Sequence, residues 1–242
     1  MPQGQTGARL LVETLVANGV DRAFCVPGES YLAVLDAMVD APGIDLVICR
    51  QEGGAAIMAD ADGKMTGKPG ICFVTRGPGA TNASAGVHIA FQDSTPMILF
   101  IGQVARHQVE REAFQEIDYR RMFGEMAKWV AQIEDPARVP EYVSHAFHTA
   151  MSGRPGPVVL ALPEDMLTEE VLKQVAIPGP AHVVQAHPGP DAMAQLRAMM
   201  ETAERPLMIL GGGSWTEQAA EDIRAFAEAN NLPTSVSFRR QD

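Results

Sequence analysis

Apolar and polar positions along the first hundred residues follow two alternating patterns. From Gln5 onward, apolar residues recur at the spacing of one helix face until Asn18 and Gly19 end the pattern. Short apolar runs then predict strands over 22–26, 45–49, 71–75 and 97–101, separated by helices over 30–39, 52–65 and 79–91. Strands that alternate with helices, with short Gly and Pro punctuation, are typical of a mostly parallel sheet flanked by helices. We therefore predict the α/β fold class.

The periodicity weakens between Gly102 and Phe123 and then returns. A helix over 138–151 and a strand over 157–162 complete the first predicted domain, residues 1–163. A long aperiodic stretch inside a compact domain commonly carries function. The segment around Phe114 is therefore a candidate for a functional loop.

Residues 164–190 are predicted to form an extended linker, since Pro178, Pro180, Pro188 and Pro190 lie among acidic and small residues. A second α/β pattern follows, with helices over 191–202 and 216–230 and strands over 207–210 and 234–237. Two strands cannot bury both faces of a parallel sheet. We therefore expect residues 191–242 to be the beginning of an incomplete domain, and the sequence to be a fragment.

The net charge of the chain argues against two classes of binding partner. It carries 19 Lys and Arg against 30 Asp and Glu, for a net charge of −11, which repels nucleic-acid phosphates and anionic lipids. The basic residues form only isolated pairs, so we expect no nucleic-acid partner and no membrane partner. No apolar run approaches the length of a membrane span, and the N-terminus lacks the basic region of an export signal.

The three cysteines, Cys25, Cys49 and Cys72, each lie in an apolar run and have no C-x-x-C spacing. A free thiol in such a run behaves as a small hydrophobic side chain. We therefore expect a reduced protein of the cytoplasm. His145 and His148 share a helix face, but they lack a third ligand nearby, so no metal site is predicted there.

Two candidate sites lie where predicted strands end and helices begin. Glu52 opens a helix after the strand 45–49, and the sequence G-P-G-A-T-N, which begins with Gly77, Pro78 and Gly79, follows the strand 71–75. Ligands bind at such places in open α/β sheets because backbone N–H groups and side chains converge there. Alternatively, Glu52 is only a first-turn acid that stabilises the helix dipole, and the glycines form an ordinary tight turn.

Together these residues resemble the pyrimidine-binding domain of thiamine-diphosphate enzymes of the acetolactate synthase type. The resemblance implies that Glu52 hydrogen-bonds N1′ of the aminopyrimidine ring and so promotes proton removal from C2 of the thiazolium. It also implies a cofactor pocket formed by a small set of residues: Pro27, Gly28, Glu52, Gly77, Pro78, Gly79 and Asn82.

Three residues are expected to face the substrate. The segment A-F-Q-E is similar to one that places Phe and Gln near the reacting centre in the family, which points to Phe114 and Gln115. Glu29 follows Pro27-Gly28 where acetolactate synthases usually have small residues, and it resembles the acidic residue of some 2-oxoacid decarboxylases. A second departure is Gln51, where acetolactate synthases commonly have His.

The resemblance implies an enzyme that decarboxylates a 2-oxoacid such as pyruvate and transfers the two-carbon unit to an acceptor. It implies thiamine diphosphate as cofactor, with Mg²⁺ bound through a G-D-G motif that this sequence lacks, so the fragment alone is expected to be inactive. FAD is an option near Gly211, Gly212 and Gly213, and a homodimer or homotetramer is expected. The alternatives are a 2-oxoacid decarboxylase or lyase of the same superfamily, and a non-catalytic or split-subunit cofactor-binding module.

Overall fold

The computed structural model describes residues 4–213 and 215–239. The chain divides into two compact units, Met1–Val183 and Val184–Asp242. The first unit contains every residue predicted to bind thiamine diphosphate or to face the substrate.

The first unit is built on one six-stranded sheet in which every pair of neighbouring strands is parallel. Its strands, in spatial order, are β2 (Asp45–Ile48), β1 (Arg22–Cys25), β3 (Gly70–Val74), β4 (Met97–Gln103), β6 (Pro157–Pro163) and β5 (Trp129–Gln132). Every residue of β3, β4 and β6 is buried, which explains why these segments read as continuous apolar runs.

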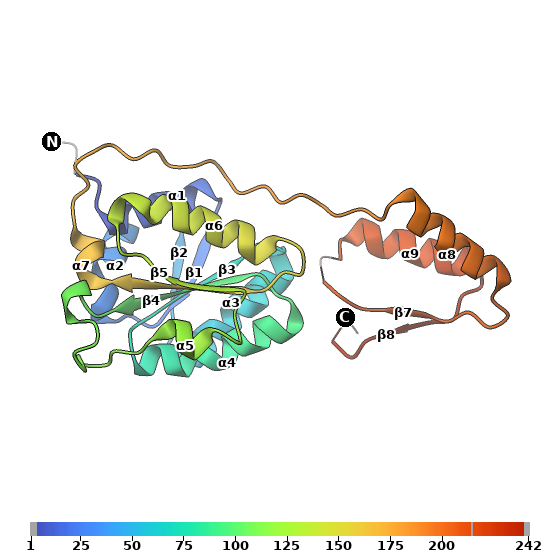
Figure 1. Cartoon of the computed structure of the whole chain (residues 1–242), viewed down its shortest axis with the longest axis horizontal. Helices are drawn as coiled ribbons and strands as arrows, with labels where there is room; N and C mark the ends of the chain where they lie inside the picture. Colours follow the sequence, from blue (N-terminus) through green and yellow to red (C-terminus); the bar gives the residue numbers. More distant parts are fainter. Residues whose placement is uncertain (1–3, 214, 240–242) are drawn as a thin grey trace. The chain divides into compact units, whose positions relative to one another are not determined.

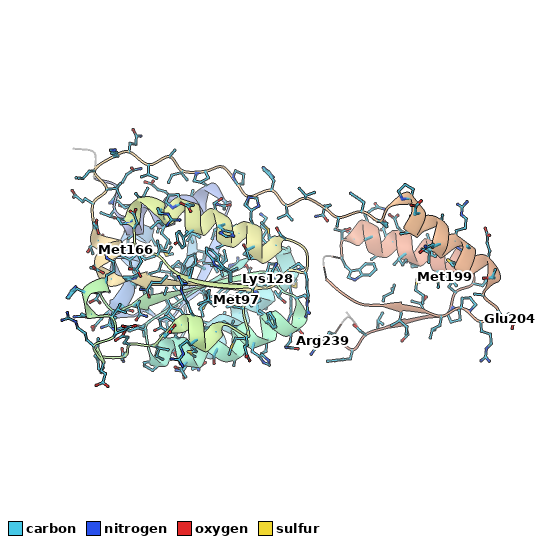
Figure 2. The ribbon with its side chains drawn as sticks, in the orientation of Figure 1. Met97, Lys128, Met166, Met199, Glu204 and Arg239 are labelled. Atoms are coloured by element: carbon cyan, nitrogen blue, oxygen red, sulfur yellow. The ribbon has the colours of Figure 1, made fainter. Side chains whose placement is uncertain are left out.

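Helices cover both faces of the sheet, so the unit has three layers (Figure 1). One face is covered by α1 (Gly7–Ala17), α2 (Leu32–Val39), α6 (Val139–Met151) and α7 (Glu164–Thr168). The other is covered by α3 (Glu52–Thr66), α4 (Pro78–Asp93) and α5 (Tyr119–Phe123). Two of the buried methionines, Met97 in β4 and Met166 in α7, are labelled in Figure 2. The parallel sheet flanked by helices confirms the predicted fold class.

The strand β5 was missed by the sequence analysis, which left residues 124–137 unassigned. This strand has four residues, only one of them fully buried, and it pairs with β6 alone at the edge of the sheet. So short a segment carries too few positions for a period to be recognised. The short helices α5 and α7 were missed for the same reason.

The segment expected to begin a linker at Glu164 packs instead on the first unit. Met166 and Leu167 of α7 are buried in its core. Beyond that helix, Gln5 exchanges two side-chain hydrogen bonds with the backbone of Val175, and the N–H of Ala181 donates to Asn18 Oδ1. The first unit therefore extends past the expected boundary, because side chains of its N-terminal region bind this backbone.

The described residues of the second unit form two parallel strands and two helices. Its elements are α8 (Pro190–Thr202), β7 (Met208–Leu210), α9 (Glu217–Ala229) and β8 (Thr234–Val236). They match the predicted ranges to within one residue. None of the described residues in these helices is buried, and Met199 of α8, labelled in Figure 2, is 70% exposed.

Candidate functional site

The predicted site lies at the carboxyl ends of β2 and β3, which lie on either side of β1 in the sheet. Glu52 opens α3 after β2, and Pro78 opens α4 after β3. The start of α3 is fixed locally, because the Gln51 side chain accepts a hydrogen bond of 2.7 Å from the N–H of Gly54. The start of α4 is fixed by Pro78 in its first turn, where no backbone N–H is needed.

Glu52 and Asn82 meet across the two helices. The side-chain amide of Asn82 donates a hydrogen bond of 2.9 Å to Glu52 Oε2. Glu52 is half-buried, and within the described part of the chain we find no hydrogen bond to its other oxygen, Oε1. This carboxylate is therefore anchored on one side and free to accept or share a proton on the other.

Thr75 lies between the two glycine turns and was not singled out from the sequence. A Cβ atom at Gly28 would lie 2.5 Å from Thr75 Cβ, and one at Gly79 would lie 2.9 Å from Thr75 Cγ2 and 3.5 Å from Glu52 Oε1. The Thr75 hydroxyl also shares a hydrogen bond of 2.8 Å with Ser30 Oγ. Both glycines are therefore required by close packing, and they bring the ends of β1 and β3 together beside Glu52.

A side chain at position 77 would be unfavourable for two reasons. The φ of Gly77 is +61°, in the left-handed region, and a Cβ atom there would lie 2.6 Å from Gln115 Cβ. Its N–H donates a hydrogen bond of 3.0 Å to the hydroxyl of Tyr119. Burial raises the pKa of Tyr119 to about 12 despite this hydrogen bond, so the hydroxyl stays neutral near pH 7. The turn at Gly77 thus contacts the segment that carries the predicted substrate-facing residues.

That segment has a strained but well-bonded backbone. Glu110, Glu112 and Gln115 have φ values of +62°, +55° and +65°. Non-glycine residues adopt this conformation at a cost, and such residues cluster at functional sites. The Glu116 carboxylate accepts hydrogen bonds from the N–H groups of Glu110 and Ala113, at 2.7 and 3.3 Å. The Glu116 side chain therefore contributes to holding the loop in this conformation.

Arg76 was also missed, although it immediately precedes the glycine turn. Its guanidinium donates to Phe114 O at 3.2 Å and to Glu164 Oε2 at 2.9 Å, and it contacts Glu29 Oε1 at 3.4 Å. A charged residue directly after an apolar strand was the available signal. The sequence gives no indication of its partners, because all three lie far along the chain.

The predicted residues do not all converge. Gly28, Glu52, Gly79 and Asn82 lie together around Thr75, and Gln115 lies on Gly77. Pro27 and Pro78 are exposed beside them, and the structure gives no contact that joins them to Glu52. The side chain of Glu29 is 79% exposed and Phe114 is 76% exposed, so both project outward from this chain.

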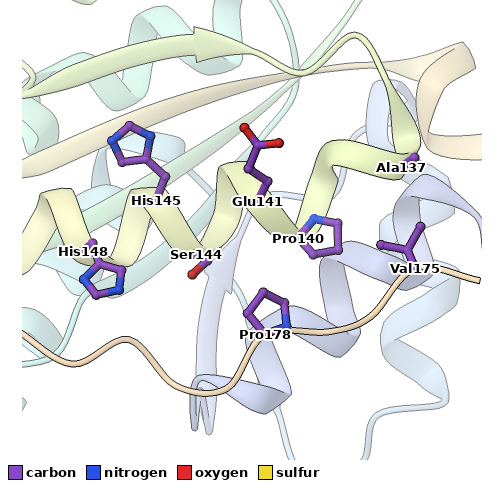
Figure 3. Close-up of a pocket in the computed structure, with 8 residues that line it drawn as sticks. All are labelled: Ala137, Pro140, Glu141, Ser144, His145, His148, Val175 and Pro178. Atoms are coloured by element: carbon purple, nitrogen blue, oxygen red, sulfur yellow. The ribbon is translucent and has the colours of Figure 1, made fainter.

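A separate pocket lies along α6 rather than at the strand ends (Figure 3). Eight residues line it: Ala137, Pro140, Glu141, Ser144, His145, His148, Val175 and Pro178. The ring of His145 stacks on Trp129 with centroids 4.2 Å apart. In the part of the chain that the structure describes, no group of three or more His, Cys, Asp or Glu is arranged to hold a metal ion. Nor does any helix among those residues have the length and apolar character needed to cross a membrane.

Sequence comparison agrees with the resemblance described above. Residues 5–122 match the family described as "Thiamine pyrophosphate enzyme, N-terminal TPP binding domain". The acetolactate synthase large subunit of Parasynechococcus marenigrum (strain WH8102) is 37% identical over 246 residues, which cover 98% of this chain and 40% of that protein.

Two further relatives are also described as acetolactate synthase large subunits. The acetolactate synthase isozyme 3 large subunit of Escherichia coli (strain K12) is 34% identical over 96% of this chain and 41% of its own length. The acetolactate synthase large subunit of Buchnera aphidicola subsp. Acyrthosiphon pisum (strain APS) is 34% identical over 96% of this chain and 42% of its own. The chain thus spans about 40% of the length of the curated relatives that it matches. Residues 5–122 of the first unit are thus similar to the N-terminal TPP-binding domain of thiamine pyrophosphate enzymes.

Proposed function

We propose that this chain supplies the pyrimidine-binding part of a thiamine-diphosphate-dependent enzyme that decarboxylates a 2-oxoacid such as pyruvate and transfers the two-carbon unit to an acceptor. The observation that carries the proposal is the half-buried Glu52, held by Asn82 beside the glycine turns. The similarity to acetolactate synthase large subunits supports the class of reaction.

The residues present fit the aminopyrimidine ring. A carboxyl group with one free oxygen can share a proton with a ring nitrogen, and Glu52 Oε1 is such an oxygen. Gly28, Gly77 and Gly79 belong to the proposed cofactor-binding set, and their missing side chains let Thr75 and Gln115 pack close to the site. Pro27, Pro78 and Asn82 complete the proposed cofactor-binding set.

Glu52 is the proposed catalytic residue, and its role is to hold a proton at the ring nitrogen N1′. When bound, thiamine diphosphate supplies a nucleophilic thiazolium carbon and an electron sink for decarboxylation. The exposed side chains of Glu29 and Phe114, with Gln115 beside Gly77, are proposed to face the 2-oxoacid and the acceptor.

Two other cofactors belong to the proposal. We assign the diphosphate and Mg²⁺ to the G-D-G motif of the family, which residues 1–242 do not contain. FAD remains an option at Gly211, Gly212 and Gly213, which follow β7 in the second unit. The three free cysteines support a location in the reducing cytoplasm.

We also propose that the enzyme is a homodimer or homotetramer whose subunits pack through α3 and α4. These two helices expose four large apolar side chains: Ile57 at 45%, Met58 at 42%, Met65 at 86% and Ile89 at 37%. Exposed apolar surface on neighbouring helices is typical of a protein interface. Glu52 opens one of these helices, so the proposed interface is adjacent to the site.

A second candidate is a 2-oxoacid decarboxylase or lyase of the same superfamily. Glu29 favours it, because a carboxyl that projects beside the site can deliver the proton that releases an aldehyde. A cofactor-binding module without activity of its own is the third reading.

The test is to incubate the full protein with pyruvate, thiamine diphosphate and Mg²⁺ and to identify the product. Acetolactate supports the carboligase, and acetaldehyde supports the decarboxylase. Cofactor binding without turnover of pyruvate or of other 2-oxoacids supports the binding module. Absence of thiamine diphosphate binding would contradict all three.

A further inference from the structure

Arg76 occupies a central and nearly buried position between the candidate site and the rest of the first unit. Its side chain is 9% exposed. The guanidinium binds three segments that are far apart along the chain: the loop at Phe114, the short helix α7 at Glu164, and the end of the first strand at Glu29. Its own backbone N–H donates to Ser30 Oγ at 3.3 Å.

Burying a guanidinium costs free energy, so the folded protein needs these contacts to stabilise the charge. A buried charge is tolerated only when it is paired and hydrogen-bonded, and hydrogen bonds to a charged group are stronger than those between neutral groups. Glu164 supplies the nearer carboxylate, and Glu29 the more distant and more exposed one. The third acceptor, Phe114 O, is a backbone atom, so Arg76 restrains the loop itself rather than one side chain.

The loop is the part of the site that most needs such a restraint. Glu110, Glu112 and Gln115 all have positive φ, and a strained backbone persists only where its surroundings determine it. Besides Arg76, the loop is held by the internal contacts of Glu116, by the side-chain amide of Gln103, which donates to Ile117 O at 2.9 Å, and by packing of Gln115 on Gly77.

We propose that Arg76 is a positioning residue that fixes the loop bearing Phe114 and Gln115, together with Glu29, on the substrate side of the site. The inference deepens the proposed function and rests on it. Arg76 contacts no cofactor or substrate in this role. It determines where the substrate-facing groups lie, while Glu52 and Asn82 remain in place without it.

The experiment compares the full protein with its Arg76→Lys variant. Lysine keeps the charge, but its three donors sit on one nitrogen at the end of a flexible stem, so it should not reproduce the fixed planar geometry in which arginine binds Phe114 O, Glu164 and Glu29. Hydrogen exchange of the amides in residues 109–118 is expected to accelerate about tenfold or more, the size expected when one charge-assisted hydrogen bond is lost. Exchange in β4 should stay unchanged. Faster exchange there as well would indicate global unfolding and not a local effect on the loop.

Kinetics provide the second readout. In Arg76→Lys the KM for pyruvate should rise about tenfold, while the affinity for thiamine diphosphate stays the same. Arg154→Lys is the control. The guanidinium of Arg154 also donates to backbone carbonyls, but these belong to Phe91 and Gln92, and its third partner is Ser94 Oγ. This control should alter neither the exchange of residues 109–118 nor the KM.

The outcomes separate this inference from the proposed function. Unchanged loop exchange and unchanged KM in Arg76→Lys, in an enzyme that turns over pyruvate, would overturn the role of Arg76 alone. Faster loop exchange in a protein that binds no thiamine diphosphate would leave the restraint intact and overturn the proposed function. If Arg76→Lys does not fold, Glu164→Gln decides: faster loop exchange supports the inference, and unchanged exchange overturns it.

Discussion

The side-chain amide of Asn82 donates a hydrogen bond of 2.9 Å to Glu52 Oε2, from one helix that opens at a strand end to another. The bond orients the carboxylate and leaves Oε1 directed toward the space beside Gly79, 3.5 Å from where a Cβ atom of that residue would lie. The pair therefore combines an acid with the group that orients it, as general acid–base catalysis requires.

Glu52→Gln in the full protein should abolish most deprotonation of C2 of the cofactor and keep the fold. An amide cannot share a proton with N1′, and general acid–base catalysis contributes roughly 10²–10⁴-fold. Hydrogen–deuterium exchange at C2 of bound thiamine diphosphate measures the loss. Glu13→Gln, at an exposed position on α1, is the control. Fast exchange in Glu52→Gln would mean that the carboxylate has no part in proton transfer.

Asn82→Ala should lower kcat/KM for pyruvate about tenfold, because a hydrogen bond to a charged group contributes roughly 1.5 kcal/mol or more. Its effect should be smaller than that of Glu52→Gln, since the carboxylate itself remains. Ser84→Ala is the matched control on the same helix, where the hydroxyl only donates to Thr81 O. Equal activity of Asn82→Ala and wild type would show that the carboxylate needs no orientation.

Gly77→Ala should destabilise the protein more than Gly153→Ala does. Both glycines have positive φ, at +61° and +58°, so each substitution strains the backbone, and the ψ of −111° places Gly77 outside the left-handed helical region that other residues can adopt. Only Gly77 of the two has a neighbour, Gln115, in the way of the new methyl group, whereas nothing lies within 4 Å at Gly153. Urea unfolding of the two variants measures the added cost of this backbone conformation and of the contact with Gln115. Equal losses would contradict both.

Charged substitutions on α3 or α4 should weaken self-association. Ile57→Glu or Ile89→Glu places a carboxylate on the apolar surface proposed as the subunit interface, where burial of an unpaired charge is unfavourable. Sedimentation velocity should show a shift toward monomer and a parallel loss of activity. Val39→Glu on α2, at a position 79% exposed, is the control. A variant of α3 that associates like wild type would place the interface elsewhere.

Asp165 should make stability depend on pH in acid. Burial favours its neutral form, but hydrogen bonds from the backbone and side chain of Arg106 outweigh burial and lower its pKa below the ordinary 3.8. A lowered pKa stabilises the folded state above the unfolded pKa, and this contribution is lost as pH falls through the folded pKa. Wild type should therefore exceed Asp165→Asn in thermal stability at pH 5–7, and the difference should shrink below about pH 4.

A constant difference between wild type and Asp165→Asn at every pH would contradict this assignment. Glu170→Gln, which leaves Arg106 and its partners unchanged, should show the acid dependence of the wild type.

Local pattern was enough to predict most of the fold and to mark the strand ends at which the candidate site lies. The strands β1, β3, β4 and β6 carry apolar runs bounded by Gly and Pro, and the predicted ranges differ from the structure by no more than two residues. Glu52 and the G-P-G turn were predicted as candidate sites because ligands bind where strands end and helices begin in open α/β sheets. These features depend on neighbours within a few residues, so they can be read along the chain.

Only the tertiary structure decided which distant groups meet. The edge strand β5 exists because β6 pairs with it, and residues beyond Glu164 stay on the first unit because Gln5 and Asn18 bind their backbone. Arg76 reaches Phe114 O and Glu164 across 38 and 88 residues, and Gly77 reaches Tyr119 across 42. Such contacts depend on strand order and helix placement, which no short window of sequence contains.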